Sequence, residues 1–395
     1  MQYRKDPRNG NALSILGLGC MRFPHSFGTS IDMDKTEKLI CEAIEHGVNY
    51  LDTAYAYSGS EVATGKILFM HGLREKVYLA TKLPHLKCKS PEDFDRFFSE
   101  QLKRLQTTYI DYYLIHNISD REAWERLQAL GIEEWIATKK AEGQIRQIGF
   151  SFHGAQTGFL SLLDAYDWDF CQIQYNYVNE CYQAGRVGLK AAYDKGMAVI
   201  IMEPLLGGKL ATGLPKQAVK LLQEADKDLS AAAWALRWVW NQPEATVVLS
   251  GMNSLEQLID NVKTANEAVP GMLTEKETST IERVVEVYRS AYKVLCTECN
   301  YCMPCPNGVN IPGCFAAYNT RLTAGLIPGM SSYVTGIGAH RQGKSMGPGS
   351  CIQCGICEKK CPQNIKVTEE LKKVKKKMEP FWFGPVIKIL RKIMN

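Results

Sequence analysis

The chain has 395 residues, of which 45% are hydrophobic and 23% are charged, which suits one large folded domain and a smaller one. Its net charge of +5 is uneven, because residues 371–395 hold eight Lys and Arg against one Glu and leave the remainder at −2. No basic groove is evident elsewhere, so we expect no nucleic-acid partner.

The first residues, Met1–Gly10, are polar, unlike a signal peptide, and no apolar run reaches the roughly 18 residues of a membrane span. We therefore expect a cytoplasmic protein, whose reducing surroundings keep thiols from pairing. Fourteen cysteines in such a chain indicate metal chemistry rather than disulfide bonds.

Eight short apolar runs lie between Ala12 and Ala291, with longer amphipathic stretches between them. The runs are Ser14–Cys20, Val48–Thr53, Val77–Leu83, Ile110–His116, Ile145–Ser151, Phe170–Tyr175, Ala198–Pro204 and Thr246–Gly251. The helix-like stretches include Lys35–Glu45, Pro91–Leu105, Trp124–Lys140 and Ser230–Asn241. Apolar strands that alternate with helices are typical of a parallel sheet buried on both faces. Eight such units in about 280 residues predict an α/β fold of the TIM (β/α)8 barrel type.

A doubly wound α/β sheet is the alternative fold. Such a sheet usually has fewer strands, and it binds dinucleotides through a loop with three spaced glycines. Here Gly17 and Gly19 lack the third glycine, because Arg22 stands in its place.

Beyond Ser290 the sequence becomes rich in cysteine, proline and glycine, and it contains two cysteine runs. The first run holds Cys296, Cys299, Cys302 and Cys305, and the second holds Cys351, Cys354, Cys357 and Cys361. Three thiolates at two-residue spacing bind three corners of a 4Fe–4S cluster, and a more distant thiolate binds the fourth. Zinc prefers two separated cysteine pairs, so the spacing favours iron–sulfur clusters over zinc.

In two-cluster bacterial ferredoxins, the fourth cysteine of each run binds the other cluster. By that logic Cys361 completes cluster 1 with the first three cysteines of the first run. Cys305 likewise completes cluster 2 with the first three cysteines of the second run. However, only two residues separate Cys302 from Cys305, where the ferredoxin run has three, so Cys314 is an alternative ligand.

These patterns predict three regions: a barrel over residues 1–293, a ferredoxin-like domain with two 4Fe–4S clusters over 294–370, and a basic amphipathic tail over 371–395. In the tail, one helical face would carry Val386, Ile389, Leu390 and Ile393. We expect this face to dock on its own protein. Contact with a membrane surface, through residues 381–383 and the lysines, is the alternative.

Polar residues at the C-terminal ends of barrel strands are candidates for catalysis, because active sites of TIM barrels lie there. Asp52 ends the second predicted strand, and Tyr57 follows in the next loop. Lys82 ends the third strand and His116 ends the fourth. Each residue alone has an ordinary structural explanation, such as a helix cap or a core histidine. Together, on three successive strands, they form a set suited to carbonyl reduction.

From Ile15 to Val367 the chain resembles the aldo-keto reductases, specifically the members with a C-terminal ferredoxin-like domain. The resemblance rests on Leu51–Tyr57, Ser60-Glu61, Ala80–Lys82, Leu114–His116 and Ile148–Ser151. It implies an NAD(P)H-dependent oxidoreductase that acts on carbonyl, aldehyde or alcohol substrates by hydride transfer.

The resemblance also implies a role for each of the four polar residues. Tyr57 would donate a proton to the carbonyl oxygen as the cofactor delivers hydride to the carbon. Lys82 would favour the phenolate of Tyr57, and Asp52 would hold Lys82 in place. His116 would orient the carbonyl group.

Contacts to the cofactor follow from the same resemblance. Ser151 and Gln172 would hold the nicotinamide amide, and Met202 stands where many relatives stack a tyrosine on the nicotinamide ring. The remaining contacts would be Pro204, Leu205, Gly207 and Lys209 at the pyrophosphate, and Ser250, Gly251, Gln257, Asp260 and Asn261 at the adenosine end.

The cofactor could be NADH or NADPH. NADPH-dependent relatives bind the 2′-phosphate with a lysine and an arginine, where this chain has Gly251 and Gln257. Two lost cations weaken phosphate binding, which favours NADH, although Lys263 is a nearby replacement.

Two functions fit these features. The first is a carbonyl reductase whose clusters exchange electrons with a ferredoxin-like carrier. The second is an electron-transfer protein that links the nicotinamide to such a carrier. A hydride carries two electrons and a 4Fe–4S cluster carries one, so coupling them normally needs a flavin. No flavin-binding motif is evident, but barrels bind FMN through phosphate loops without one, so a flavin stays an open alternative.

Overall fold

The computed structural model describes the chain except for residues 27–29, 338–345, 382, 386 and 388–395. The chain forms two compact units. Unit 1 comprises Met1–Leu205 and Lys227–Thr278, and unit 2 comprises Leu206–Asp226 and Ser279–Asn395. Within the described residues, no helix has both the length and the apolar character to cross a membrane.

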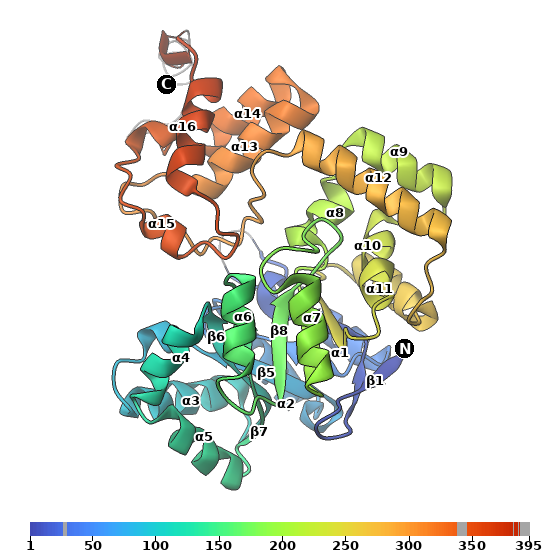
Figure 1. Ribbon diagram of the computed structural model, residues 1–395, viewed down its shortest axis with the longest axis vertical. Coiled ribbons are helices and arrows are strands. Elements are labelled where there is room, and N and C mark those ends of the chain that lie inside the picture. The colour runs from blue at the N-terminus through green and yellow to red at the C-terminus, as the bar shows by residue number, and fades with distance from the viewer. Residues whose placement is uncertain (27–29, 338–345, 382, 386, 388–395) are drawn as a thin grey trace. The chain divides into compact units, whose positions relative to one another are not determined.

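Unit 1 is a closed barrel of eight parallel strands with helices around it (Figure 1). Each predicted apolar run contains or overlaps one strand. The strands are β3 (Leu16–Gly19), β4 (Tyr50–Asp52), β5 (Tyr78–Leu83), β6 (Ile110–Ile118), β7 (Ile145–Phe152), β8 (Phe170–Gln174), β9 (Ala198–Met202) and β10 (Val247–Ser250). They pair in chain order, and β10 closes the barrel by pairing with both β9 and β3. The prediction of a TIM barrel is therefore confirmed.

Nine α-helices of the described residues lie wholly within unit 1. They are α1 (Met33–Glu45), α2 (Ser60–Met70), α3 (Glu92–Leu105), α4 (Arg121–Gln128), α5 (Ile132–Ala141), α6 (Gln156–Leu163), α7 (Gly185–Asp194), α10 (Ala231–Trp240) and α11 (Leu255–Glu267). Three short 3-10 turns join them: η1 (Cys20–Arg22), η2 (Arg74–Lys76) and η3 (His85–Lys87). The single helical stretch expected over Trp124–Lys140 is wrong. It is two helices, because Gly131 adopts a φ of +79° and turns the chain between α4 and α5.

Side chains fill the interior of the barrel. Tyr112 meets Tyr50 and Phe170 at ring-centroid distances of 5.2 and 5.0 Å. Gly17 makes room in this core, because a Cβ at its position would stand 2.7 Å from the Leu249 Cδ2 atom. A hairpin that the sequence patterns missed, β1 (Tyr3–Lys5) and β2 (Ala12–Ser14), contributes Leu13 to the same cluster. This packed interior fixes the strands whose C-terminal ends carry the polar residues.

Unit 2 is helical in the part that the structure describes. It contains η4 (Leu206–Gly208), α8 (Lys209–Thr212), α9 (Lys216–Ala225), most of α12 (Glu275–Ala291), α13 (Ile311–Ala324), α14 (Leu326–Gly336), η5 (Pro348–Ser350), α15 (Ile356–Lys359) and α16 (Val367–Met378). Its core packs α13, α14 and α16 together through Phe315, Tyr333 and Val374. The Tyr333 hydroxyl donates a hydrogen bond to Glu379 at 2.7 Å.

The predicted tail, residues 371–395, begins inside α16. Leu371, Val374 and Met378 form the buried side of this helix, and its lysines are exposed. Phe383 contacts Tyr333 at a ring-centroid distance of 5.7 Å. The apolar face expected from Val386, Ile389, Leu390 and Ile393 lies outside the described residues, as does Trp382. The boundaries proposed for the three regions stay predictions.

Candidate active site and cluster-binding loops

Asp52 and Lys82 form a buried ion pair at the C-terminal ends of β4 and β5. The Lys82 Nζ donates to the two Asp52 carboxylate oxygens at 2.6 and 2.8 Å and to the Thr53 carbonyl oxygen at 2.8 Å. These contacts use all three ammonium hydrogens, and the Lys82 side chain is only 1% exposed. A charge buried this deeply is costly unless it is paired, so the carboxylate is what keeps a cation at this position.

Tyr57 lies beside this pair, in the loop after β4. The Lys82 Nζ is 5.0 Å from the centroid of the Tyr57 ring. The His116 ring is 5.9 Å from the Tyr57 ring, centroid to centroid, at an angle of 88°. The structure thus brings together at one end of the barrel the four residues that sequence analysis selected.

The residues Ser60 and Glu61, which follow Tyr57 at the start of α2, support this arrangement. The Ser60 hydroxyl donates to the Cys20 carbonyl oxygen at 2.8 Å. The buried Glu61 carboxylate accepts hydrogen bonds from Thr81 Oγ1 at 2.7 Å, Gln101 Nε2 at 2.8 Å and Arg104 Nη1 at 3.1 Å. Because Thr81 precedes Lys82, these contacts tie the helix after the tyrosine loop to the strand that carries the lysine.

A β-bulge places His116. The pairing of β6 with β7 shifts in register between Ile115 and Ile118, and Asn117 has a φ of +58°, which asparagine tolerates better than most residues. The Asn117 N–H donates to the Ser151 Oγ at 2.8 Å. A bulge re-aims side chains next to a site. Here His116 faces Tyr57, while the next residue in the chain holds Ser151.

Burial sets the charge states in this site. Burial raises the pKa of Asp52, and the Lys82 cation and a hydrogen bond from Gln172 oppose the rise. Burial, followed by the Lys82 cation, lowers the pKa of His116 well below its ordinary value. A neutral imidazole has one N–H to donate. His116 is therefore suited to bind an oxygen atom without adding a second positive charge.

Two more histidines, which sequence analysis missed, follow the strands on either side of β6. His85 follows β5 and His153 follows β7, and burial lowers the pKa of each to about 4. The His85 Nε2 and the His153 Nδ1 are buried and have no hydrogen-bond partner within the described part of the chain. Their position just after a predicted strand was the one signal that could have found them.

Ser151 and Gln172 lie side by side, in register, on β7 and β8. The Gln172 Nε2 donates to Asp52 at 3.4 Å, but its Oε1 is buried and unpaired among the described residues. A buried acceptor without a partner costs free energy that a ligand can recover. A primary amide can donate to Gln172 and accept from the Ser151 hydroxyl, so these residues fit the nicotinamide amide. Met202, at the end of β9, packs on the barrel interior.

Four of the five residues expected at the adenosine end already have local partners. The Asn261 Nδ2 donates to the Ser250 Oγ at 3.0 Å. Asp260 accepts a hydrogen bond from the Ser230 hydroxyl at 2.6 Å, and Gln257 accepts one from the Asn253 N–H at 3.0 Å. These contacts join the end of β10 and the start of α11 into one folded segment.

Arg22 lies against Gly251, the fifth of these residues. A Cβ at Gly251 would stand 3.5 to 3.7 Å from the Cδ, Cβ and Cγ atoms of Arg22. The aliphatic part of a cationic side chain therefore packs against the glycine that stands where NADPH-dependent relatives were expected to have lysine. The two residues are far apart in sequence, so nothing in the spacing could have revealed their contact.

The segment expected at the pyrophosphate turns sharply. Leu206 has a φ of +48°, which bulky residues rarely adopt, and Gly207 follows with +66°. Pro204 and Leu205 belong to unit 1, whereas Gly207 and Lys209 belong to unit 2.

Lys209 is paired inside unit 2. Its Nζ lies 3.0 Å from the Glu298 carboxylate, which stands within the first cysteine run. A phosphate that binds Lys209 would therefore compete with Glu298.

The two cysteine runs share one backbone conformation. Glu298 and Asn300 have φ values of +57° and +64°, and the matching Gln353 and Gly355 have +59° and +73°. These residues flank the second cysteine of each run. Left-handed residues on both sides curl each run into the same kind of loop.

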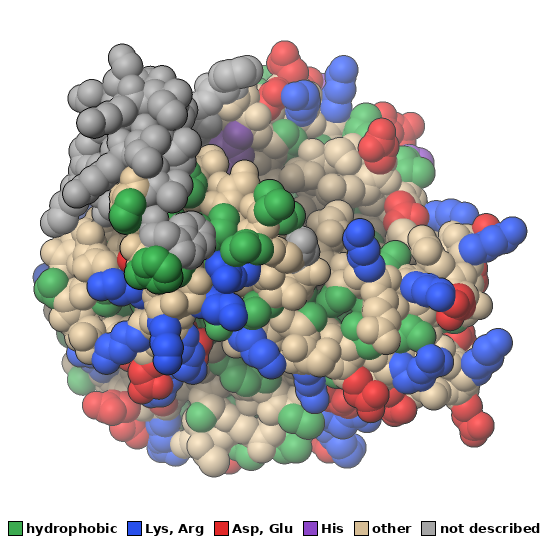
Figure 2. Space-filling model, turned by 90° about the horizontal axis from the view of Figure 1, so that it is seen from above, with side chains coloured by type: hydrophobic (Ala, Val, Ile, Leu, Met, Phe, Trp, Pro, Cys, Tyr) green, Lys and Arg blue, Asp and Glu red, His purple; other side chains and the backbone are tan. Residues whose placement is uncertain are grey.

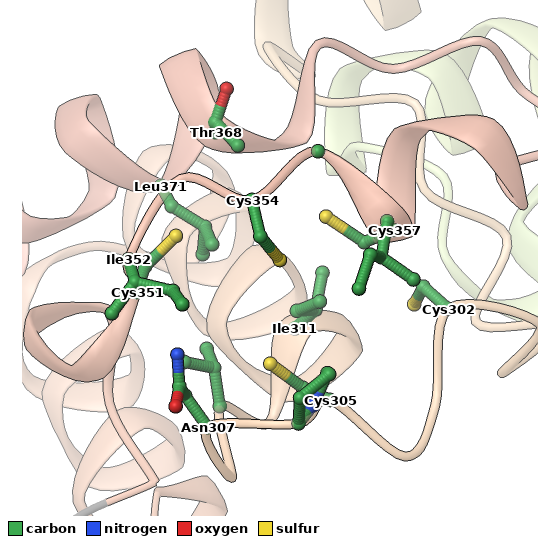
Figure 3. Close-up of a pocket in the computed structure, with 14 residues that line it drawn as sticks. Cys302, Cys305, Asn307, Ile311, Cys351, Ile352, Cys354, Cys357, Thr368 and Leu371 are labelled. Atoms are coloured by element: carbon green, nitrogen blue, oxygen red, sulfur yellow. The ribbon is translucent and has the colours of Figure 1, made fainter.

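The thiols from both runs meet in one cavity. It is lined by five cysteines: Cys302, Cys305, Cys351, Cys354 and Cys357. Figure 3 shows the sulfur atoms of Cys305, Cys351, Cys354 and Cys357 turned toward the same space, with Cys302 at its edge. Cys314 is not among the lining residues, because it is buried in the core of unit 2. Four converging thiols are the donor set that a 4Fe–4S cluster requires, so this cavity fits one.

A second group of thiols surrounds Cys302. Burial raises its pKa to about 12, and the thiols of Cys296, Cys299 and Cys361 add to the rise. Each group thus contains three cysteines of one run and one of the other. Within the described residues, no three His, Cys, Asp or Glu side chains are placed to hold a single metal ion. A 4Fe–4S cluster has four iron atoms and takes one thiolate at each corner.

Comparisons with known proteins identify both parts of the chain. Residues 15–286 match the model of the aldo/keto reductase family, and residues 295–372 match that of a 4Fe-4S dicluster domain. The chain therefore belongs to the aldo/keto reductase family and is an oxidoreductase of that type, with a C-terminal 4Fe–4S ferredoxin-like domain. The predicted resemblance is confirmed.

Curated relatives agree with this assignment. An uncharacterized oxidoreductase, YrpG, of Bacillus subtilis is 29% identical over 305 residues, which cover 67% of this chain and 90% of that protein. Protein tas of Escherichia coli is 25% identical over 349 residues, which cover 73% of this chain and 99% of that protein.

Solved structures show the same barrel. An aldo-keto reductase from Bacillus halodurans in its holo form has a TM-score of 0.58 and 27% identity, covering 72% of this chain and 96% of that one. An aldo-keto reductase from Klebsiella pneumoniae in complex with NADPH has a TM-score of 0.58 and 23% identity, covering 72% and 95%.

The buried histidines predict a loss of stability in acid. A histidine with a folded pKa of about 4, such as His85, binds fewer protons when folded than when unfolded, where its pKa is about 6.5. The free energy of unfolding should therefore fall as the pH drops from about 6.5 toward 4, by up to about 1.4 kcal/mol per pH unit from His85. Urea unfolding between pH 6.5 and 5 should show a shallower fall for His85→Gln than for the parent protein. The half-exposed His46 provides the control, His46→Gln, and equal slopes for all three proteins would contradict the prediction.

Proposed function

We propose that this protein reduces carbonyl or aldehyde substrates, or oxidises the corresponding alcohols, by hydride transfer with a nicotinamide cofactor. Two 4Fe–4S clusters in unit 2 exchange electrons with a carrier protein. The observation that carries the catalytic part is the buried Lys82–Asp52 pair, with Tyr57 and His116 beside it at the strand ends.

Tyr57 acts as the proton donor. A cation 5.0 Å from its ring favours the phenolate, so the phenol releases its proton more readily to a carbonyl oxygen. Asp52 keeps that cation charged and fixed. The neutral imidazole of His116 donates a hydrogen bond to the same oxygen and thereby orients the carbonyl for proton transfer.

Ser151 and Gln172 hold the cofactor at its amide, and the unpaired Gln172 Oε1 supports this assignment. The bound nicotinamide supplies the hydride. The NADPH complex of the Klebsiella pneumoniae relative supports a cofactor of this class. NADH is slightly favoured because Gly251 and Gln257 carry no charge. Arg22 offsets part of that loss from its position against Gly251 and keeps NADPH usable.

The eight cysteines of the two runs hold the clusters. Cys361 completes cluster 1 with Cys296, Cys299 and Cys302, and Cys305 completes cluster 2 with the first three cysteines of the second run. The shared cavity supports the ligand set of cluster 2. The effect of the Cys296, Cys299 and Cys361 thiols on the pKa of Cys302 supports that of cluster 1.

The second candidate function is electron transfer between the nicotinamide and a ferredoxin-type carrier through a flavin. The exposure of Cys354, which lines the cavity, favours this function. Flavin released on denaturing the anaerobically purified protein would support this function, because a flavin converts a hydride into single electrons.

Replacing the proton donor should abolish most of the activity. Tyr57→Phe should lower kcat for NADPH-dependent reduction of 4-nitrobenzaldehyde by about 100-fold or more, because general acid catalysis is lost. The Kd for NADPH, measured by fluorescence titration, should not change. Tyr55→Phe is the matched control, since the Tyr55 hydroxyl in the same loop bonds Glu100 instead. Full activity of Tyr57→Phe would show that another group protonates the substrate.

Removing the Arg22 cation should affect NADPH more than NADH. Arg22→Met should lower kcat/KM for NADPH by about tenfold, the cost of losing one charge-assisted contact to phosphate, and leave NADH nearly unaffected. Lys263→Met gives a comparison with the other candidate cation. If Arg22→Met weakens both cofactors equally, Arg22 contacts a part that they share, and its assignment to the 2′-phosphate is wrong.

The two candidate ligands of cluster 2 can be separated by iron content. Cys305→Ala should retain about half of the roughly eight iron atoms expected per chain. Cys314→Ala should retain all of them, since Cys314 is buried in the core away from the cavity. The measurement is iron analysis and EPR of anaerobically purified protein. The opposite pattern would identify Cys314 as the ligand.

A further inference from the structure

The edge of unit 2 around Cys354 combines an exposed thiol with exposed apolar side chains. Cys354 is the one exposed residue among the five cysteines that line the cavity. Ile352 and Ile356, on either side of it in sequence, are 68% and 43% exposed. Large apolar side chains left in water beside a functional group are typical of a recognition surface.

Lysines surround these residues. Residues 351–378 carry three glutamates and eight lysines: Lys359, Lys360, Lys366, Lys372, Lys373, Lys375, Lys376 and Lys377. All eight lysines are exposed. Within the described residues, Lys373 is the one with an ion-pair partner, Glu370 at 2.6 Å. Figure 2 shows Lys and Arg side chains spread over the face in view, with exposed hydrophobic side chains among them.

The lysine-bearing helices form part of the wall of the cavity. Thr368 and Leu371 of α16 line it together with Ile356 of α15 (Figure 3). The two helices are joined there, because the Glu358 carboxylate accepts hydrogen bonds from the Thr368 N–H at 2.8 Å and from its hydroxyl at 2.7 Å. The helices that carry these lysines are therefore held against the cavity.

We propose that this surface, formed by Ile352, Cys354, Ile356, Lys359 and Lys360 and called here the Cys354 face, docks an acidic one-electron carrier protein. The inference rests on the proposed function, in that it requires cluster 2 to be redox-active. In each encounter the carrier loses one electron and the cluster gains it, or the reverse, and no covalent bond forms or breaks.

Charge and polarity select this partner. A positive surface accelerates association with a negative protein, and small interfaces with an apolar centre and a charged rim suit a carrier that must leave after one electron. An anionic membrane would also attract the lysines. Binding to a membrane does not, however, account for the apolar residues and the exposed thiol at the edge of a redox cavity.

Charge reversal on the Cys354 face tests the proposal. Oxidised holoenzyme is mixed anaerobically with the hydroquinone of an acidic flavodoxin, and formation of the flavodoxin semiquinone is followed by stopped-flow absorbance. Lys359→Glu combined with Lys360→Glu should lower the second-order rate constant by about tenfold or more at low ionic strength. High salt should reduce the difference in rate constant between this variant and the parent protein, because screening removes the electrostatic steering of the carrier.

The matched control makes the same change in net charge elsewhere in unit 2. Lys216 and Lys220 are exposed on α9, which contributes no residue to the cavity. Lys216→Glu combined with Lys220→Glu should change the rate constant less than twofold. Ile352→Ser tests the apolar part and should slow the reaction by a salt-independent factor. Equal rates for the Lys359/Lys360 variant and the control would overturn the proposal.

Two further measurements separate this proposal from the proposed function. Reduction by dithionite, followed by EPR, reports on the clusters without a protein partner. NADPH-dependent aldehyde reduction reports on the barrel alone. If dithionite cannot reduce the clusters, both the proposed function and the docking proposal are wrong. If dithionite reduces them but the rate of electron transfer from flavodoxin does not depend on the charges of the Cys354 face, the docking proposal alone is wrong. If the Lys359/Lys360 variant instead keeps its flavodoxin rate but no longer sediments with phosphatidylglycerol vesicles, the face binds anionic lipid and the proposal is wrong.

Discussion

The ion pair between Lys82 and Asp52 is the interaction on which the candidate active site depends. A positive charge on a side chain that is 1% exposed is costly unless a carboxylate and a carbonyl oxygen surround it. Asp52 and Thr53 supply those oxygens, and both precede the loop that carries Tyr57. The contacts that keep the lysine charged therefore also fix the start of the tyrosine loop. The same cation helps to keep His116 neutral, so one buried charge governs the electrostatics of two neighbouring side chains.

The barrel and its four polar residues could be predicted because each rests on local pattern. Eight apolar runs with helical stretches between them define the strands, and the strand ends then select Asp52, Lys82 and His116. Contacts between segments that are distant in sequence leave no local pattern, so they could not be predicted. Arg22 meets Gly251 only because β3 and β10 pair when the barrel closes. The hairpin that adds Leu13 to the core consists of strands too short to show a period. Gly131, whose left-handed backbone separates α4 from α5, was hidden inside a continuous amphipathic pattern.

In unit 2, spacing grouped cysteines that lie far apart along the chain. Cys305 shares a cavity with three cysteines of the second run, and Cys361 lies among those of the first. What spacing could not supply was the choice between Cys305 and Cys314. Burial distinguishes them, because Cys314 lies within the packed core of α13 while Cys305 faces the cavity. The two runs also share a backbone conformation, because each has left-handed residues on both sides of its second cysteine. The side chains alone do not reveal this similarity.

Because β6 contains a bulge, the geometry of the candidate site depends on the number of residues in that strand. In a regular strand, consecutive side chains point to opposite faces, so one residue in two is available to a site. The extra residue lets His116 reach Tyr57 while the very next N–H reaches Ser151. Deleting Asn117 would leave every candidate catalytic side chain in the sequence and restore a regular pleat. It would also move the side chains at the end of the strand to the opposite face of the sheet. The candidate site is thus specified by the length of a strand as well as by the identity of its residues.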